Sequence, residues 1–178
     1  MKKALNFLTL PLAQVLVLGI GAVCFYLLSR TGYEFLAFIA MMIYILAGWL
    51  YSKTEDKKIR IISVICTVAL MWCFTGIISF LSLSESVNSS GNMLYLVLLG
   101  NPVVTNVANR CIDLIKIEPA IYATMLSVLS PISVAISVGA GKVFEMKNKK
   151  AKIILFIVMA AVCITFLVLG IVDVTSVK

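Results

Sequence analysis

The polar residues best suited to chemistry in this sequence gather in one short segment, between residues 101 and 113. They are amides, a hydroxyl, a guanidinium and a carboxylate: Asn101, Thr105, Asn106, Asn109, Arg110 and Asp113. The last five share one side of a predicted helix whose other side is apolar. Polar groups beside a broken helix can line the path of a substrate or an ion. The alternative is a helix on the outer membrane surface that keeps its polar side in water.

Catalytic chemistry is difficult to assemble from this sequence. The chain has no histidine, which excludes a histidine base, a histidine metal ligand and a Ser-His pair. Its acids fall in loops or at the ends of apolar stretches, so no two carboxylates can share a proton at depth in a membrane. The cysteines form no C-x-x-C pair, which is the spacing typical of redox or metal sites. We therefore expect no enzyme, no metal site and no cofactor.

The composition predicts the environment in which these residues must lie. The chain has 178 residues, of which 62% are hydrophobic and 13% charged, and its mean hydropathy is +1.10. Soluble domains are about half apolar and a quarter charged, and a soluble fold of this size cannot bury so much apolar surface. The same composition excludes a disordered chain. The sequence therefore predicts one integral membrane domain over residues 1–178.

Five stretches are long and apolar enough to cross a bilayer, which takes roughly 20 helical residues. They cover residues 6–29, 35–52, 61–83, 119–143 and 153–174. None alternates apolar and polar residues as β-barrel strands do, so the predicted fold class is an all-α polytopic helical bundle. Residues 93–118 contain a seven-residue apolar run that breaks at Gly100-Asn101-Pro102. This pattern predicts an interfacial or re-entrant helix, with a sixth span as the alternative.

Basic residues indicate how the five spans are oriented. Most of them fall before the first span, between the second and third, or between the fourth and fifth: Lys2, Lys3, Lys53, Lys57, Lys58, Arg60, Lys142, Lys147, Lys149, Lys150 and Lys152. Five spans place all of these segments on one side of the membrane, which the positive-inside rule identifies as cytoplasmic. We expect a bacterial-type inner-membrane protein with its N-terminus inside and its C-terminus outside. A sixth span would move residues 142–152 outside.

Small residues in the fourth span predict where helices approach closely. One row recurs every four residues: Ala123, Ser127, Pro131, Ala135 and Gly139. A second row beside it contains Ser133, Ser137 and Gly141. Such rows form helix contacts in lipid, either within one chain or between subunits. Pro131 is expected to kink this helix and to leave a carbonyl free near Ser127.

The short basic loops suggest a function without catalysis. Their candidate contact residues are Lys57, Lys58, Arg60, Lys147, Lys149 and Lys150, which fit anionic lipid head groups or an acidic cytosolic partner. No basic face of the kind that binds nucleic acid is present in the sequence. We expect an anchoring, sensing or regulatory subunit of a homo-oligomer or a membrane complex. The alternative is a small channel or carrier whose path is formed by residues 101–113 and the Pro131 kink.

Overall fold

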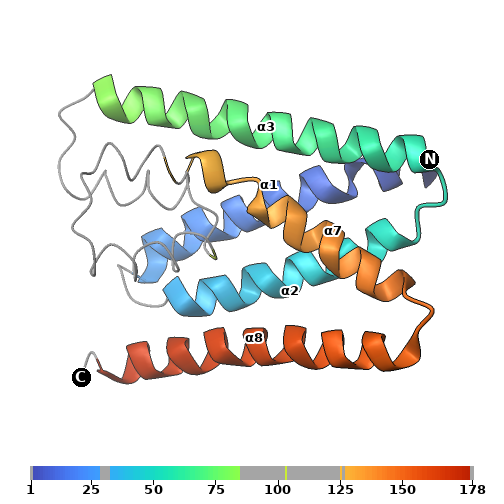
Figure 1. Cartoon of the computed structure of the whole chain (residues 1–178). Helices are drawn as coiled ribbons and strands as arrows, with labels where there is room; N and C mark the ends of the chain where they lie inside the picture. Colours follow the sequence, from blue (N-terminus) through green and yellow to red (C-terminus); the bar gives the residue numbers. More distant parts are fainter. Residues whose placement is uncertain (1, 29–32, 85–102, 104–124, 126, 177–178) are drawn as a thin grey trace.

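The computed structural model describes residues 2–28, 33–84, 103, 125 and 127–176. This part of the chain forms five long helices, drawn in Figure 1: α1 (Lys2–Leu28), α2 (Tyr33–Ser52), α3 (Lys57–Ser84), α7 (Ile132–Glu145) and α8 (Lys149–Ser176). It contains no strand, so the predicted all-α fold class is confirmed for the described residues.

Four helical stretches are long and apolar enough to cross a membrane. They are Phe35–Ser52, Lys57–Ile77, Ser127–Glu145 and Lys149–Val172. Within the residues of α1 whose side chains are described, the apolar stretch is Phe7–Ile20. Each of these stretches falls within or overlaps one of the five predicted spans. Of the predicted interfacial segment 93–118, only Val103 belongs to the described residues, so the number of spans stays a prediction.

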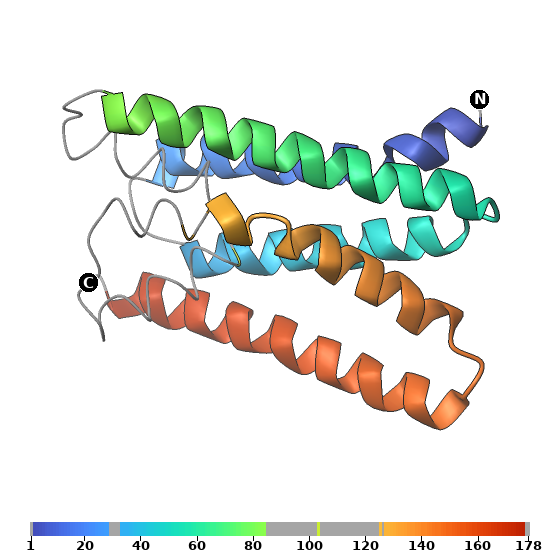
Figure 2. The ribbon, with the colours of Figure 1, turned by 45° about the horizontal axis from the view of Figure 1, so that its top comes forward.

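Helix α2 is the central element of the bundle. It packs against α1, α7 and α8, whereas α3 packs mainly against α1 (Figures 1 and 2). The outer helices α3 and α8 expose large aliphatic and aromatic side chains along their length, among them Ile61, Ile65, Trp72, Ile77, Ile153, Ile157 and Ile171. Such faces are unfavourable in water but suit a hydrocarbon environment. The exposed apolar helices are compatible with a membrane location.

The core consists of two clusters that follow one another along α2. One cluster joins Leu10 and Ala13 of α1 to Ala47 and Tyr51 of α2 and Val134 of α7. The other joins α1, α2 and α8, and its buried residues are Val17, Ala37, Ala40, Met41, Tyr44, Val103, Cys163 and Phe166. Helix α7 therefore belongs mainly to the first cluster and α8 to the second.

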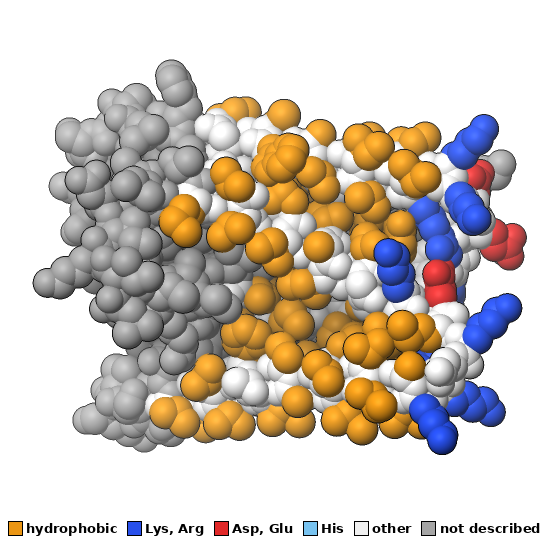
Figure 3. All heavy atoms as spheres, viewed as in Figure 1, with side chains coloured by type: hydrophobic (Ala, Val, Ile, Leu, Met, Phe, Trp, Pro, Cys, Tyr) orange, Lys and Arg blue, Asp and Glu red, His pale blue; other side chains and the backbone are white. Residues whose placement is uncertain are grey.

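Basic side chains gather at one end of the bundle, as Figure 3 shows. We call this region the basic end. It comprises the connection from α2 to α3 and the connection from α7 to α8, with the basic residues of segments 53–60 and 142–152. These two short connections carry helix caps formed by residue types that are typical of this position. The Asp56 carboxylate accepts the Lys58 backbone N–H at 2.9 Å, and the Asn148 side chain accepts the Lys150 N–H at 3.1 Å. The caps fix where α3 and α8 begin.

Candidate functional site

The six predicted site residues between positions 101 and 113 lie outside the described residues. This applies to Asn101, Thr105, Asn106, Asn109, Arg110 and Asp113, and equally to Ala123 of the small-residue row. Within the described part of the chain, polar side chains concentrate in two other places. One is the interior of the bundle between α1, α3 and α7, and the other is the basic end.

The close contact between α2 and α7 uses the second small-residue row. A Cβ added to Gly48 would lie 2.8 Å from the Gly141 backbone nitrogen, and Ser133 and Ser137 are fully buried nearby on α7. Ala135 and Gly139 are instead exposed on the opposite side of α7. Ala135 and Gly139 therefore do not contact α2, and the use of their row as a helix seam stays a prediction. Periodicity identified both rows, but it could not say which one faces α2.

The predicted break at Pro131 is present, but the carbonyl it frees has a partner. Residues 127–129 form a helical turn, and α7 begins only after the turn at Ser130 and Pro131 (Figure 2). The Ser130 hydroxyl donates to the Ser127 carbonyl at 2.8 Å, so the expectation of a free carbonyl is wrong. The Ser127 hydroxyl donates to Thr75 Oγ1 of α3 at 3.1 Å. The turn before the break is thus attached to α3, whereas α7 itself packs on α2.

At a second proline, a side chain of a neighbouring helix donates the hydrogen bond that the proline cannot donate. Pro11 lies inside α1 and has no N–H to donate to the Phe7 carbonyl one turn earlier. The Ser63 hydroxyl of α3 donates to this carbonyl at 2.7 Å. This contact ties α1 to α3 where the helix would otherwise leave a backbone acceptor unsatisfied. The proline indicated a free carbonyl in the sequence, but its donor is 56 residues away along the chain.

We expect replacement of Ser63 by alanine to destabilise the fold by about 1 kcal/mol, because the Phe7 carbonyl loses its donor. The matched background is Pro11→Ala, which restores an N–H at residue 11. In that background, Ser63→Ala should lower the unfolding free energy by markedly less than it does in the unaltered chain. The measurement is a double-mutant cycle on unfolding free energies in detergent. An identical cost in both backgrounds would contradict the assignment.

Buried hydroxyls form the rest of the polar interior. We use the name polar core for Gln14, Ser63, Thr67, Thr75, Ser130, Ser133 and Ser137, each at most 1% exposed. Most of the hydroxyls donate to a carbonyl of their own helix, for example Thr67 to Ser63 at 2.6 Å and Ser137 to Ser133 at 3.1 Å. Gln14 differs, since its Nε2 finds no acceptor within the described structure. The polar core can therefore hydrogen-bond, but it holds no group able to act as a general base at neutral pH.

At the basic end, Arg60 is committed to internal contacts. Its Nη2 donates to the Ser52 carbonyl at 2.6 Å, its Nε donates to the Thr54 carbonyl, and the guanidinium forms an ion pair with Glu145. The guanidinium carbon also lies 5.3 Å from the centre of the Tyr51 ring. Arg60 thus joins the end of α2 and the start of α3 to the end of α7. Arg60 therefore has internal partners at Nε and Nη2, and the expectation that it also contacts lipid or a partner stays a prediction.

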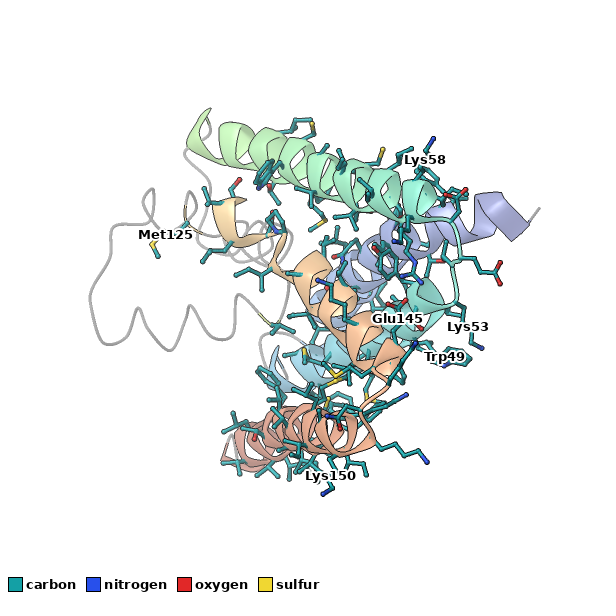
Figure 4. All side chains as sticks on the ribbon, turned by 45° about the vertical axis from the view of Figure 1, so that its right-hand side comes forward. Trp49, Lys53, Lys58, Met125, Glu145 and Lys150 are labelled. Atoms are coloured by element: carbon teal, nitrogen blue, oxygen red, sulfur yellow. The ribbon has the colours of Figure 1, made fainter. Side chains whose placement is uncertain are left out.

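Two lysines at this end also have internal partners. Lys53 Nζ lies 3.5 Å from the Trp49 ring centre (Figure 4), a cation–π contact. Lys152 Nζ donates to the Phe144 carbonyl at 2.8 Å and thereby links α7 to α8. The rings of Phe144 and Phe156 meet edge to face beside it, with centroids 5.0 Å apart.

The remaining candidate lysines are exposed: Lys57, Lys58, Lys147, Lys149 and Lys150. In Figure 4, Lys58 and Lys150 extend from the two outer helices, with Glu145 between them in that view. None of the five takes part in an ion pair among the residues that the structure describes. The basic end therefore offers unneutralised positive charge on a rigid support. No protein-family model, curated protein or solved structure matches the chain.

Proposed function

We propose that this chain is a non-catalytic multi-pass membrane protein that binds an acidic cytosolic partner through its basic end. It would serve as an anchoring, sensing or regulatory subunit in a bacterial-type inner membrane. In this proposal the N-terminus is cytoplasmic and the C-terminus is outside. The collection of basic side chains at one end of the bundle supports this orientation, because cytoplasmic loops are enriched in lysine and arginine.

The placement of the lysines is the observation that best supports docking. Both α3 and α8 begin with two consecutive lysines and have no acid in their first turn. Positive charge is unfavourable there, because a helix N-terminus already carries partial positive charge. Among the nearby acids, Glu145 pairs with Arg60, Asp56 caps the start of α3, and Glu55 is exposed in the same connection. The start of α8, which is capped by the neutral Asn148 side chain, would therefore attract an external anionic group more strongly than the start of α3.

We expect the triple substitution of Lys147, Lys149 and Lys150 by glutamine to lower partner recovery tenfold or more. Each exposed ion pair contributes on the order of 0.5 kcal/mol, and three act together. The measurement is quantitative mass spectrometry of proteins co-purified with the tagged chain at low and high salt.

Substitution of the same three lysines by arginine is the matched control. It keeps the charge and should retain the partner and its salt sensitivity. Equal recovery by the glutamine variant and the unaltered chain would contradict docking through this surface.

The outward side of α7 offers a place for a second subunit. Ala135 and Gly139 are exposed there, and a Cβ added to Gly139 would meet no atom within 4 Å. Small residues spaced four apart permit close helix approach in lipid. This face supports the proposal that the chain works in a homo-oligomer or with other membrane subunits.

A small channel or carrier is the second candidate function. It is favoured by the helix break at Pro131 and by the buried hydroxyls beside it, because interrupted helices line solute sites in transporters. The six site residues assigned to this path between positions 101 and 113 lie outside the described residues. Gln14 and the polar core are the parts on which this function can be tested.

A further inference from the structure

We infer that the exposed side of α2 binds an anionic phospholipid, with the phosphate at Lys53 and Trp49 and an acyl chain along the helix. This inference rests on the membrane location that is part of the proposed function. It is independent of a cytosolic partner at the basic end.

Helix α2 is the central helix, yet one of its sides is not covered by the other described helices. Its large exposed side chains recur at helical spacing and therefore share this side. They are Phe35, Met42, Leu46, Trp49 and Leu50, each 37–55% exposed. Lys53 follows α2 directly and is exposed one turn beyond Trp49. Because the stretch Phe35–Ser52 is long and apolar enough to cross a membrane, an occupant of this side lies within the bilayer.

Helix α8 leaves this side open because it packs on α2 through one half only. Gly170 lies against the Phe35 backbone, and Cys163 and Phe166 are buried in the core cluster that α8 shares with α2. Residues 149–162 of α8 include no buried residue. The two helices diverge towards the basic end in Figures 1 and 2. The end of α2 that carries Trp49 and Lys53 is therefore accessible.

Trp49 and Lys53 provide groups that bind a phosphate at a membrane surface. The Lys53 ammonium lies 3.5 Å from the centre of the Trp49 ring (Figure 4), which holds its charge beside the end of the helix. Among the described residues, this ammonium forms no ion pair, and neither it nor the indole N–H donates a hydrogen bond. A phosphate oxygen accepts from both groups. Tryptophan and lysine at the end of a span are typical of the depth at which lipid head groups lie.

The side chains on this surface favour a lipid over a second helix. Close helix contacts in a membrane use small residues, as Gly48 and Gly141 do between α2 and α7. The exposed side of α2 instead presents methionine, leucine and tryptophan, which suit a flexible acyl chain. Charge favours an anionic head group, because residues 146–152 at the same end of the bundle add four lysines and no acid.

The test uses the purified full chain with Trp72→Phe, in which Trp49 is the only tryptophan. It is reconstituted in vesicles of phosphatidylglycerol and phosphatidylcholine, where one lipid at a time carries brominated acyl chains that quench indole fluorescence on contact. At equal molar fraction, we expect brominated phosphatidylglycerol to compete for contact with Trp49 about tenfold better than brominated phosphatidylcholine, as for a charge-assisted hydrogen bond. Lys53→Gln should abolish this preference, whereas Lys53→Arg, which keeps the charge, should retain it.

Lys58→Gln is the matched control, because Lys58 is exposed at the same end of the bundle and takes part in no cation–π contact among the described residues. It removes the same charge and should keep the preference, as should the triple lysine-to-glutamine variant of the basic end. Circular dichroism reports whether each variant is folded.

The inference is overturned if both brominated lipids quench Trp49 equally, or if folded Lys53→Gln keeps the preference. It is also overturned if Lys58→Gln loses the preference as completely as Lys53→Gln, because general attraction to the positive surface would then explain it. Equal quenching still places Trp49 in the bilayer and leaves the proposed membrane location intact. Absence of quenching by either lipid would contradict the membrane location as well.

Discussion

Replacement of Gly48 by alanine is expected to separate α2 from α7 and to destabilise the bundle by about 3 kcal/mol. An added Cβ would overlap the Ser137 carbonyl oxygen, and it would lie 2.8 Å from the Gly141 nitrogen and 2.9 Å from the Ala140 Cβ. Two of these three neighbours are backbone atoms, which cannot move aside as a flexible side chain would. The helices must therefore move apart, which loses close packing over the most extensive contact among the described helices.

Gly139→Ala is the matched control, since the same change is made on the exposed side of α7, where a Cβ meets nothing within 4 Å. It should leave stability unchanged or raise it slightly, because alanine favours helix more than glycine. Unfolding by denaturing detergent, followed by circular dichroism, compares the two variants. If Gly48→Ala is as stable as Gly139→Ala, the α2–α7 contact described here is wrong.

Replacement of Arg60 by alanine is expected to cost about 2 kcal/mol and to loosen the basic end. It leaves the carbonyls of Ser52 and Thr54 without their donor and removes the partner of Glu145. Hydrogen bonds from a charged group contribute more than neutral ones. The partial exposure of this pair to solvent keeps the ionic contribution small. Most of the loss is therefore expected from the two carbonyls.

Lys58→Ala serves as the comparison, because Lys58 is exposed two residues away on the same helix. Its effect should stay within about 0.5 kcal/mol. Arg60→Lys keeps the charge but cannot reproduce the planar fork, so its stability should fall between the two. Equal unfolding free energies for Arg60→Ala and Lys58→Ala would exclude the joining role of Arg60. Partner recovery should also fall for Arg60→Ala, because the lysine-bearing helix starts lose their fixed positions.

Much of the helical architecture could be predicted from the sequence. Long apolar runs predicted helices that overlap all five described helices, whereas the caps at Asp56 and Asn148 were identified only in the structure, although their residue types are typical of caps. These properties are local, because each depends on residues within a few turns of one another. The gathering of basic residues at one end also followed from the sequence, since an even number of spans separates the basic segments.

The sites were predicted less well, because they depend on which faces of different helices meet. Arg60 was grouped with the exposed lysines, although its guanidinium binds two carbonyls and Glu145. Gln14 was one polar residue in an apolar run, and its burial became evident only from the packing of α1 among three other helices. Of the segment richest in polar residues, 101–113, only Val103 is described, so the role of the segment stays a prediction.

The sequence by itself determined an all-helical, apolar chain with its basic residues in a few short segments, because hydropathy and charge act residue by residue. Only the tertiary structure decided that Gly48 and Gly141 form the seam and that Ala135 and Gly139 face outward. It also decided that Ser63 satisfies the carbonyl freed by Pro11. In both cases the deciding contact joins residues far apart in the chain, and their distance depends on how whole helices pack. The residue periodicity of a single helix does not specify how far that helix lies from its neighbours.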